Sequence, residues 1–150
     1  MKLAAIAQMI NVLQAMILTD KEKMLLTPTY HVFDMYRPFQ GATPYPASVA
    51  SPAYTHGDVV QQAVDASAAR GTDGKLYLAL VNVDPNRPAR VTTSLSGRAA
   101  GRILTGPSID THNTFDRPNT IQPAAYSARS AGGKLVFDLP AKSVAVVAVE

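Results

Sequence analysis

The chain has 150 residues, of which 47% are apolar and 17% charged, so it is long enough to bury one domain-sized core. It contains no cysteine, which excludes disulfides, thiol nucleophiles and thiolate metal sites. The formal charge of +3 comes from scattered Lys and Arg without interleaved aromatic residues, so we expect no nucleic-acid partner. Eleven prolines and nine glycines fall between short apolar runs, which favours β-structure with many turns.

The first apolar segment, Leu3–Leu18, follows a basic start and imitates a signal peptide. Gln8, Asn11 and Gln14 interrupt it, and polar amides are costly in an apolar segment. The segment is also too short and too polar to span a membrane, so we expect no membrane partner. A spacing of three between polar residues fits one side of a buried helix, and it fits equally a buried strand that runs into a loop.

A charged turn at Thr19–Lys23 separates this segment from a predicted helix. Thr27 suits the N-cap and Pro28 the first helical position, and bulky side chains then recur at helical spacing. Pro38 should end the helix, because proline cannot donate the hydrogen bond that would continue it. Residues 39–57 contain further prolines and glycines, which indicates a connector and a domain boundary.

After the connector the pattern changes to strands. Short apolar runs separated by turn residues, with no helix between them, predict an antiparallel β-sandwich. The expected strands are residues 59–69, 75–83, 90–95, 102–104, 134–139 and 143–149. A turn is expected at Gly71–Gly74, and residues 106–129 are polar enough to predict a long irregular loop.

Two long motifs and two short ones occur in order along the chain. They are Ala7–Asp20 (AQMINVLQAMILTD), Thr27–Tyr36 (TPTYHVFDMY), His112–Pro118 (HNTFDRP) and Leu139–Ser143 (LPAKS). The first two resemble the end of the catalytic barrel, and the helix after it, in glycoside hydrolase family 51 α-L-arabinofuranosidases. The last two resemble landmarks of the carboxyl-terminal sandwich of that family. Long motifs at matching separation are far more specific than one short pattern.

The resemblance implies a mainly β fold, in which an antiparallel, jelly-roll-like β-sandwich follows the last β/α unit of a TIM barrel. The first segment is then the eighth barrel strand with the loop after it. The implied division is a barrel end at residues 1–38, a connector at 39–57 and a sandwich domain at 58–150. Because members of the family begin well upstream, we expect Met1 to mark a truncated gene model, a partial sequence or an internal start.

The implied activity is hydrolysis of terminal non-reducing α-L-arabinofuranosyl residues from arabinan or arabinoxylan by a retaining mechanism. Such enzymes need two carboxyl groups about 5 Å apart. In the family they are glutamates on earlier barrel strands, whereas the glutamates of this chain, Glu22 and Glu150, match no catalytic motif. We therefore expect the chain alone to be inactive. The alternative is a non-catalytic carbohydrate-binding or structural β-sandwich module, for which the absence of tryptophan makes the signal weak.

Gln8 lies where the family has a glutamine that binds the arabinosyl unit. An amide both donates to and accepts from sugar hydroxyls. The competing interpretation is that Gln8 caps backbone groups or packs in the core. Asn11 and Gln14 are weaker candidates and are better explained as loop-ordering amides.

The three histidines lack metal-ligand spacing, so we expect no metal site and no cofactor. The expected partners are an arabinose-containing glycan in the full-length enzyme and a second copy of the chain in a homo-oligomer.

Overall fold

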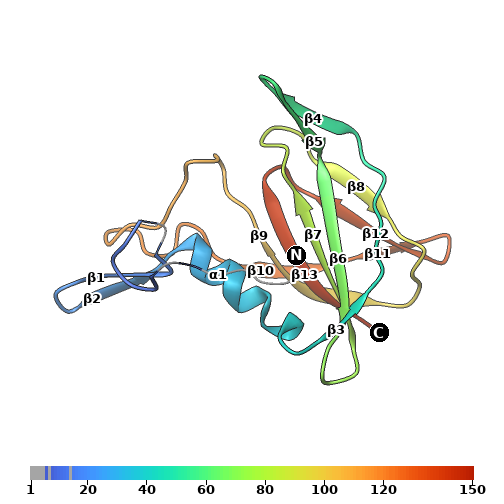
Figure 1. The fold of residues 1–150 in the computed structure, drawn as a ribbon, viewed down its shortest axis with the longest axis horizontal. Helices are drawn as coiled ribbons and strands as arrows, with labels where there is room; N and C mark the ends of the chain where they lie inside the picture. Colours follow the sequence, from blue (N-terminus) through green and yellow to red (C-terminus); the bar gives the residue numbers. More distant parts are fainter. Residues whose placement is uncertain (1–5, 7, 14) are drawn as a thin grey trace.

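The computed structural model describes residue 6, residues 8–13 and residues 15–150. Two antiparallel sheets form a β-sandwich (Figure 1). The larger sheet has the strand order β10-β9-β13-β7-β6-β3, and the smaller has the order β11-β12-β8. The larger sheet contains β3 (Thr43–Tyr45), β6 (Val64–Arg70), β7 (Leu76–Asn82), β9 (Ala99–Leu104), β10 (Ala124–Ser127) and β13 (Ser143–Val149). The smaller contains β8 (Ala89–Thr92), β11 (Arg129–Ala131) and β12 (Lys134–Leu139). The predicted antiparallel sandwich is confirmed.

The main core lies between these two sheets. Successive side chains of a strand point to opposite faces, so every second residue of β7 and β13 faces the smaller sheet. Leu80 and Val147 do so and pack with Phe137 and Leu135 of β12, all of them fully buried. Burial of each such side chain stabilises the fold by about 1.5–3 kcal/mol.

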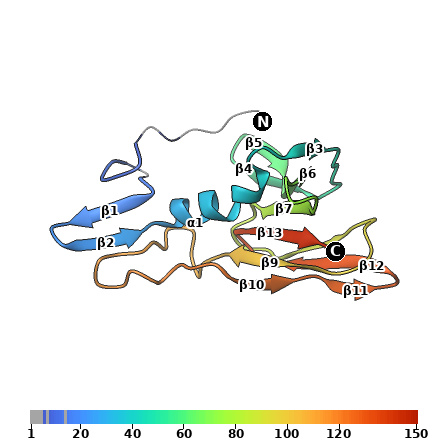
Figure 2. The same cartoon turned by 90° about the horizontal axis from the view of Figure 1, so that it is seen from below.

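Helix α1 (Pro28–Met35) packs with its C-terminal end on part of the other face of the larger sheet (Figure 2). Met35 is the helix residue that is buried there, and it packs on Ala79 and Val146 of the sheet. Arg102 of β9 also donates to Asp34 Oδ2 at 2.8 Å, and this hydrogen bond is the main reason why the pKa of Asp34 lies below its usual value. The central strands are thus covered on both faces, which explains their continuous apolar sequences.

The helix begins as predicted. Thr27 has an extended backbone, its hydroxyl accepts from the Tyr30 N–H at 3.4 Å, and Pro28 follows at the first helical position. The chain leaves α1 at Tyr36 and makes a short 3-10 helix, η1 (Arg37–Phe39), which contains Pro38. Proline therefore ends the α-helix without ending the helical path of the chain.

The predicted strands at 75–83, 134–139 and 143–149 are confirmed as β7, β12 and β13. The run at 59–69 is not one strand. It divides at Ala63 into β6 and an outer hairpin strand, β5 (Val59–Gln62), which pairs with β4 (Ala53–His56). The prediction of one irregular loop at 106–129 was wrong at its end, where β10 forms an edge strand. Edge strands expose both faces in part, so the apolar alternation that predicts a strand is weak.

The charged turn after the first segment closes a hairpin, β1 (Ile17–Asp20) and β2 (Lys23–Leu26). The sequence did not predict this hairpin. Residues 1–5, 7 and 14 of the segment predicted to hold the barrel strand and its loop lie outside those described. Residues 8–13, 15 and 16 show only an isolated parallel bridge between Ile10 and Ile17.

The range predicted as a connector, 39–57, contains β3, which pairs with β6, and β4. The division into 1–38, 39–57 and 58–150 stays a prediction. No helix among the described residues is long and apolar enough to cross a lipid bilayer.

Candidate sugar-contact loop

The polar residue singled out by the sequence, Gln8, lies in the irregular stretch before β1. Its side chain is exposed, and it makes no hydrogen bond to another residue that the structure describes. Toward the described residues, the donors and the acceptor of this amide are therefore unused. Sugar contact, capping of backbone groups and core packing all stay predictions for Gln8.

Asn11 orders the same stretch. Its backbone is left-handed, with φ of 55°, a conformation that asparagine tolerates better than most residues. Its Nδ2 donates to Thr19 Oγ1 at 2.7 Å, and its Oδ1 accepts from the Thr19 N–H at 2.7 Å. Both ends of this amide are engaged with β1, as expected of an amide that orders the loop, and its weaker candidacy as a sugar contact stays a prediction. Gln14, the third candidate, lies outside the described residues.

The loop is fastened at two further points. The Ile17 N–H donates to the Met9 carbonyl at 2.9 Å, directly beside Gln8. Thr27 donates from its hydroxyl to the Ala15 carbonyl at 2.8 Å and from its N–H to the Met16 carbonyl at 3.0 Å. The residue that caps α1 thus also holds the end of the loop that carries Gln8.

The long loop between β9 and β10 runs beneath α1 toward the β1–β2 hairpin (Figure 2). Asn113 in this loop is buried, and its Nδ2 donates to the Leu26 carbonyl at 2.8 Å. His112, beside it, contacts the Asp110 carbonyl at 2.9 Å through Nδ1 and so shapes the same loop. Sequence reasoning found this motif by its resemblance but assigned Asn113 no role.

The carboxyl groups of the chain do not form a catalytic pair. Glu22 lies in the turn between β1 and β2, and Glu150 follows β13, at the opposite end of the molecule in Figure 1. Glu150 is paired with Lys75 at 2.9 Å, and this contact lowers its pKa. A general acid needs a raised pKa. The pKa values of Asp34, Asp73, Asp110 and Asp138 are lowered as well, chiefly by hydrogen bonds from neighbouring side chains.

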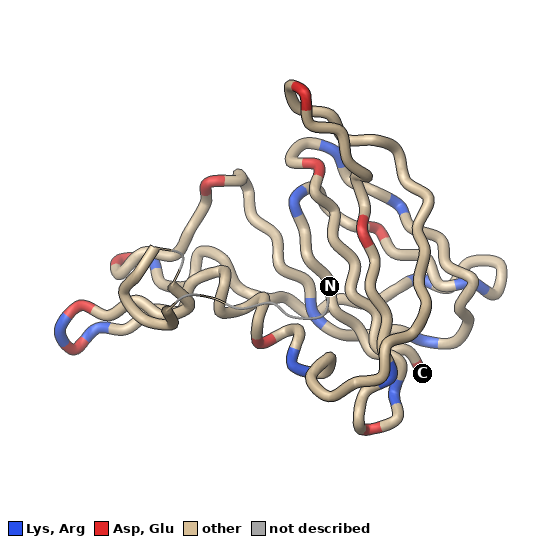
Figure 3. The backbone as a smooth tube through the Cα atoms, in the orientation of Figure 1, with Lys and Arg blue, Asp and Glu red and all other residues tan. Residues whose placement is uncertain are grey.

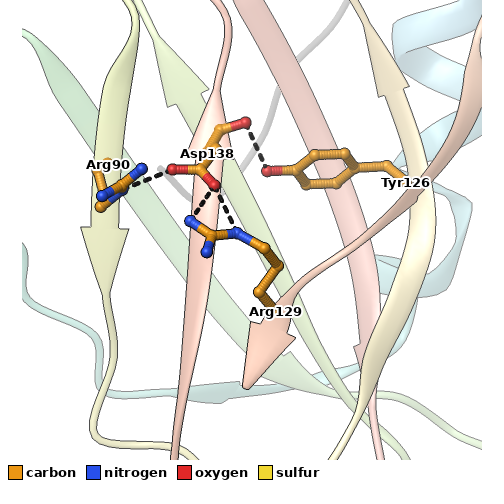
Figure 4. Close-up of polar contacts among 4 residues, drawn as sticks. All are labelled: Arg90, Tyr126, Arg129 and Asp138. Carbon is orange, nitrogen blue, oxygen red and sulfur yellow. Dashed lines mark hydrogen bonds and ion pairs between the residues drawn. The ribbon is translucent and has the colours of Figure 1, made fainter. Parts of the chain in front are cut away.

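Asp138 of β12 is the centre of a surface cluster (Figure 4). Arg90 of β8 donates to its Oδ1 at 2.7 Å, and Arg129 of β11 donates to its Oδ2 at 2.8 Å. The hydrogen bond from Arg90, and after it the one from Arg129, hold the pKa of Asp138 below its usual value. The Tyr126 hydroxyl donates to the Asp138 carbonyl, and burial, with the nearby carboxylate, raises the pKa of Tyr126 to about 12. The cluster joins the strands of the smaller sheet to β10, so we interpret it as structural.

Other binding chemistry has little support in the described part of the chain. No group of three His, Asp or Glu side chains there is placed to hold a metal ion. Lys and Arg are spread over many elements (Figure 3). A cleft of about 430 Å³ opens between residues 48–53 and β8, but none of its lining residues is aromatic, so it offers a sugar ring no stacking surface.

The fold and the loop define a class of protein: a β-sandwich module, joined to a helix and a polar loop, that lacks an acid/base pair of its own. Comparison with known proteins gives the family. The chain belongs to the alpha-L-arabinofuranosidase C-terminal domain family, whose profile matches residues 1–143.

Similar proteins carry this segment within a longer chain. The intracellular exo-alpha-L-arabinofuranosidase of Bacteroides ovatus is 36% identical over the whole chain, which spans 30% of that protein. The family GH51 arabinofuranosidase of Xanthomonas axonopodis pv. citri matches 96% of the chain with a TM-score of 0.90 and 45% identity, over 30% of its own length. The thermostable GH51 alpha-L-arabinofuranosidase of Thermotoga petrophila RKU-1 matches 96% with a TM-score of 0.79 and 25% identity, over 33% of its length.

Proposed function

We propose that this chain is the carboxyl-terminal part of an α-L-arabinofuranosidase that removes terminal non-reducing α-L-arabinofuranosyl residues from arabinan or arabinoxylan with retention of configuration. The observation that carries the proposal is the match of 96% of the chain to the Xanthomonas enzyme at 45% identity and a TM-score of 0.90. The acid/base and nucleophile carboxylates would come from protein outside residues 1–150, because the glutamates of this chain lie at opposite ends of the fold.

Within that enzyme, Gln8 is the sugar contact. A furanosyl hydroxyl can donate one hydrogen bond and accept others. A primary amide can accept the first through its oxygen and donate the others through its NH₂ group. Its exposed position and its freedom from other described hydrogen bonds support this role. The contact would orient the ring relative to the carboxylates, and orientation of a bound substrate contributes directly to the rate.

The remaining chain acts as a brace. Residues 1–38 would complete the barrel, and residues 58–150 would hold that barrel end through the packing of Met35 on the sheet and through Asn113. In this proposal the sandwich carries no substrate. Saturable binding of the isolated chain to arabinan in a pull-down would instead favour the carbohydrate-binding alternative.

The proposed activity is tested in two preparations. The purified 150-residue chain should give no turnover of 4-nitrophenyl α-L-arabinofuranoside. A chimera in which residues 1–150 replace the matching 30% of the Xanthomonas enzyme should hydrolyse it. Turnover by the chain alone would refute the statement that the carboxylates lie elsewhere. A folded but inactive chimera would refute the assignment to this enzyme.

A homo-oligomer is proposed from the hairpin β4–β5, which projects from the sandwich in Figure 1. Val59 and Val60 on it are 61% and 65% exposed. An isolated two-stranded hairpin is marginally stable in water, so a contact with a second copy would stabilise it. Sedimentation velocity at increasing concentration should show self-association that Val60→Thr weakens, whereas a monomer at every concentration would exclude it.

A further inference from the structure

Asn113 is a buried amide in the long loop between β9 and β10. It is 4% exposed, and a buried amide needs hydrogen-bond partners for its donors and its acceptor. It has three. Oδ1 accepts from the Ile121 N–H at 2.7 Å, and Nδ2 donates to the Ile121 carbonyl at 3.0 Å and to the Leu26 carbonyl at 2.8 Å.

Two of these bonds fix the amide to the sandwich. They clamp Asn113 to the backbone of Ile121, eight residues away, and the Ile121 side chain is buried in the cluster with Met35, Leu104 and Val146. The position of Asn113 is therefore set by the packed face of the larger sheet. The third bond crosses 87 residues of sequence and fixes the end of β2 to that face.

From the end of β2 the hydrogen bonds continue into the loop that carries Gln8. Leu26 is paired with Ile17 in the hairpin, and the next residue, Thr27, binds the carbonyls of Ala15 and Met16. Ile17 in turn donates to the Met9 carbonyl, beside Gln8. The path is an unbroken series of short backbone and side-chain contacts, of the kind that can transmit a displacement between two sites.

We propose that Asn113 is a positioning residue for the sugar contact: by holding the Leu26 carbonyl, it sets the place of the loop that presents Gln8. The functional half of this inference rests on the proposed activity. Its structural half, the dependence of the loop on Asn113, does not.

The chemistry of the site identifies the most informative substitution. Asn113→Asp keeps the size of the side chain and the acceptor for the Ile121 N–H. It replaces the NH₂ group with an oxygen that faces two carbonyl oxygens, so both donated bonds are lost and repulsion replaces them. Asn119→Asp makes the same change at an exposed asparagine in the same loop and serves as the matched control.

Amide hydrogen exchange on the 150-residue chain, followed by NMR, tests the structural half. Asn113→Asp should speed exchange at the N–H groups of Ile17 and Thr27 by about 10-fold or more, because local opening is measured residue by residue. Exchange at Ala145 and Val147 of the central strand β13 should not change. Asn119→Asp should alter neither set.

Two results would overturn the inference. One is unchanged exchange at Ile17 and Thr27. The other is equal acceleration at all four amides, which would make Asn113 a residue of general stability only. If Asn113→Asp fails to fold, Thr27→Val breaks the next link in the path. It should give the same selective loss, with rescue by Thr27→Ser, which keeps the hydroxyl. If Thr27→Ser does not restore slow exchange at these amides, the path through the Thr27 hydroxyl is excluded.

The chimera tests the functional half. Asn113→Asp should lower kcat/KM for the aryl arabinofuranoside by about 10-fold, and in a variant that already carries Gln8→Ala it should lower it much less, because coupled residues are not additive. Full additivity would overturn the link to Gln8. If Gln8→Ala itself has no effect, the proposed sugar contact fails, whereas the dependence of the loop on Asn113 is still decided by hydrogen exchange.

Discussion

The packing of α1 on the sandwich predicts a large loss of stability for Met35→Ala. Met35 is 1% exposed and contributes to the cluster formed with Ala79, Leu104, Ile121 and Val146. Truncation of a buried methionine to alanine costs about 2–5 kcal/mol, from lost burial and from the cavity that remains. Because the cavity would face rigid strands of the central sheet, we expect little collapse and a loss of about 3 kcal/mol. For a domain of this size that corresponds to a fall in Tm of about 6–12 °C.

Urea unfolding followed by circular dichroism measures this loss, and Met24→Ala is the matched control. Met24 lies on β2 and is 63% exposed, so its truncation should change the free energy of unfolding by less than about 0.5 kcal/mol. An equal, small effect of both substitutions would refute the packing of α1 against the sheet. It would also remove the physical basis for the sandwich as a brace.

Two further predictions concern the sandwich itself. Asp138→Asn should lower the urea midpoint at pH 7, with the exposed Asp116→Asn as control. The folded-state pKa of Asp138 is lowered, so its contribution is present above the ordinary value of 3.8 and is lost as the pH falls through the folded pKa. The difference between wild type and variant should therefore shrink in acid, and a constant difference would contradict the ion pairs. Gly101→Ala should destabilise the chain by about 3 kcal/mol, measured in the same way, because the added Cβ would collide with the Val146 carbonyl oxygen.

The sequence predicts best those elements that the fold buries on both faces. In β7 and β13 nearly every side chain is covered, by the smaller sheet on one side and by α1 on the other, so the apolar runs are long and continuous. The helix start at Thr27 was equally clear, because capping chemistry is local. These elements could be placed without knowledge of their partners.

The elements and contacts that were missed are exposed, or have partners distant in sequence. β10 is an edge strand with three of its four residues exposed, so it lacks the apolar alternation of a strand. The charged turn between β1 and β2 was predicted as a turn, but its residues do not show that the two flanking segments pair as a hairpin. Asn113 was not recognised as a contact because its partner, Leu26, lies 87 residues earlier. The prediction that Gln8 contacts the sugar rested on the chemistry of its amide and on the family resemblance, not on any periodic pattern in the sequence.

The central claim is that this chain provides the sugar-contacting amide of an arabinofuranosidase and no catalytic carboxylate. The most direct measurement is kcat/KM of the chimera on 4-nitrophenyl α-L-arabinofuranoside, with Gln8→Ala compared with Gln62→Ala, an exposed glutamine on β5. We expect Gln8→Ala to lower kcat/KM by about 100-fold, as loss of a hydrogen bond that orients the substrate does, and Gln62→Ala to leave it unchanged. Equal activity of the two variants would contradict the account.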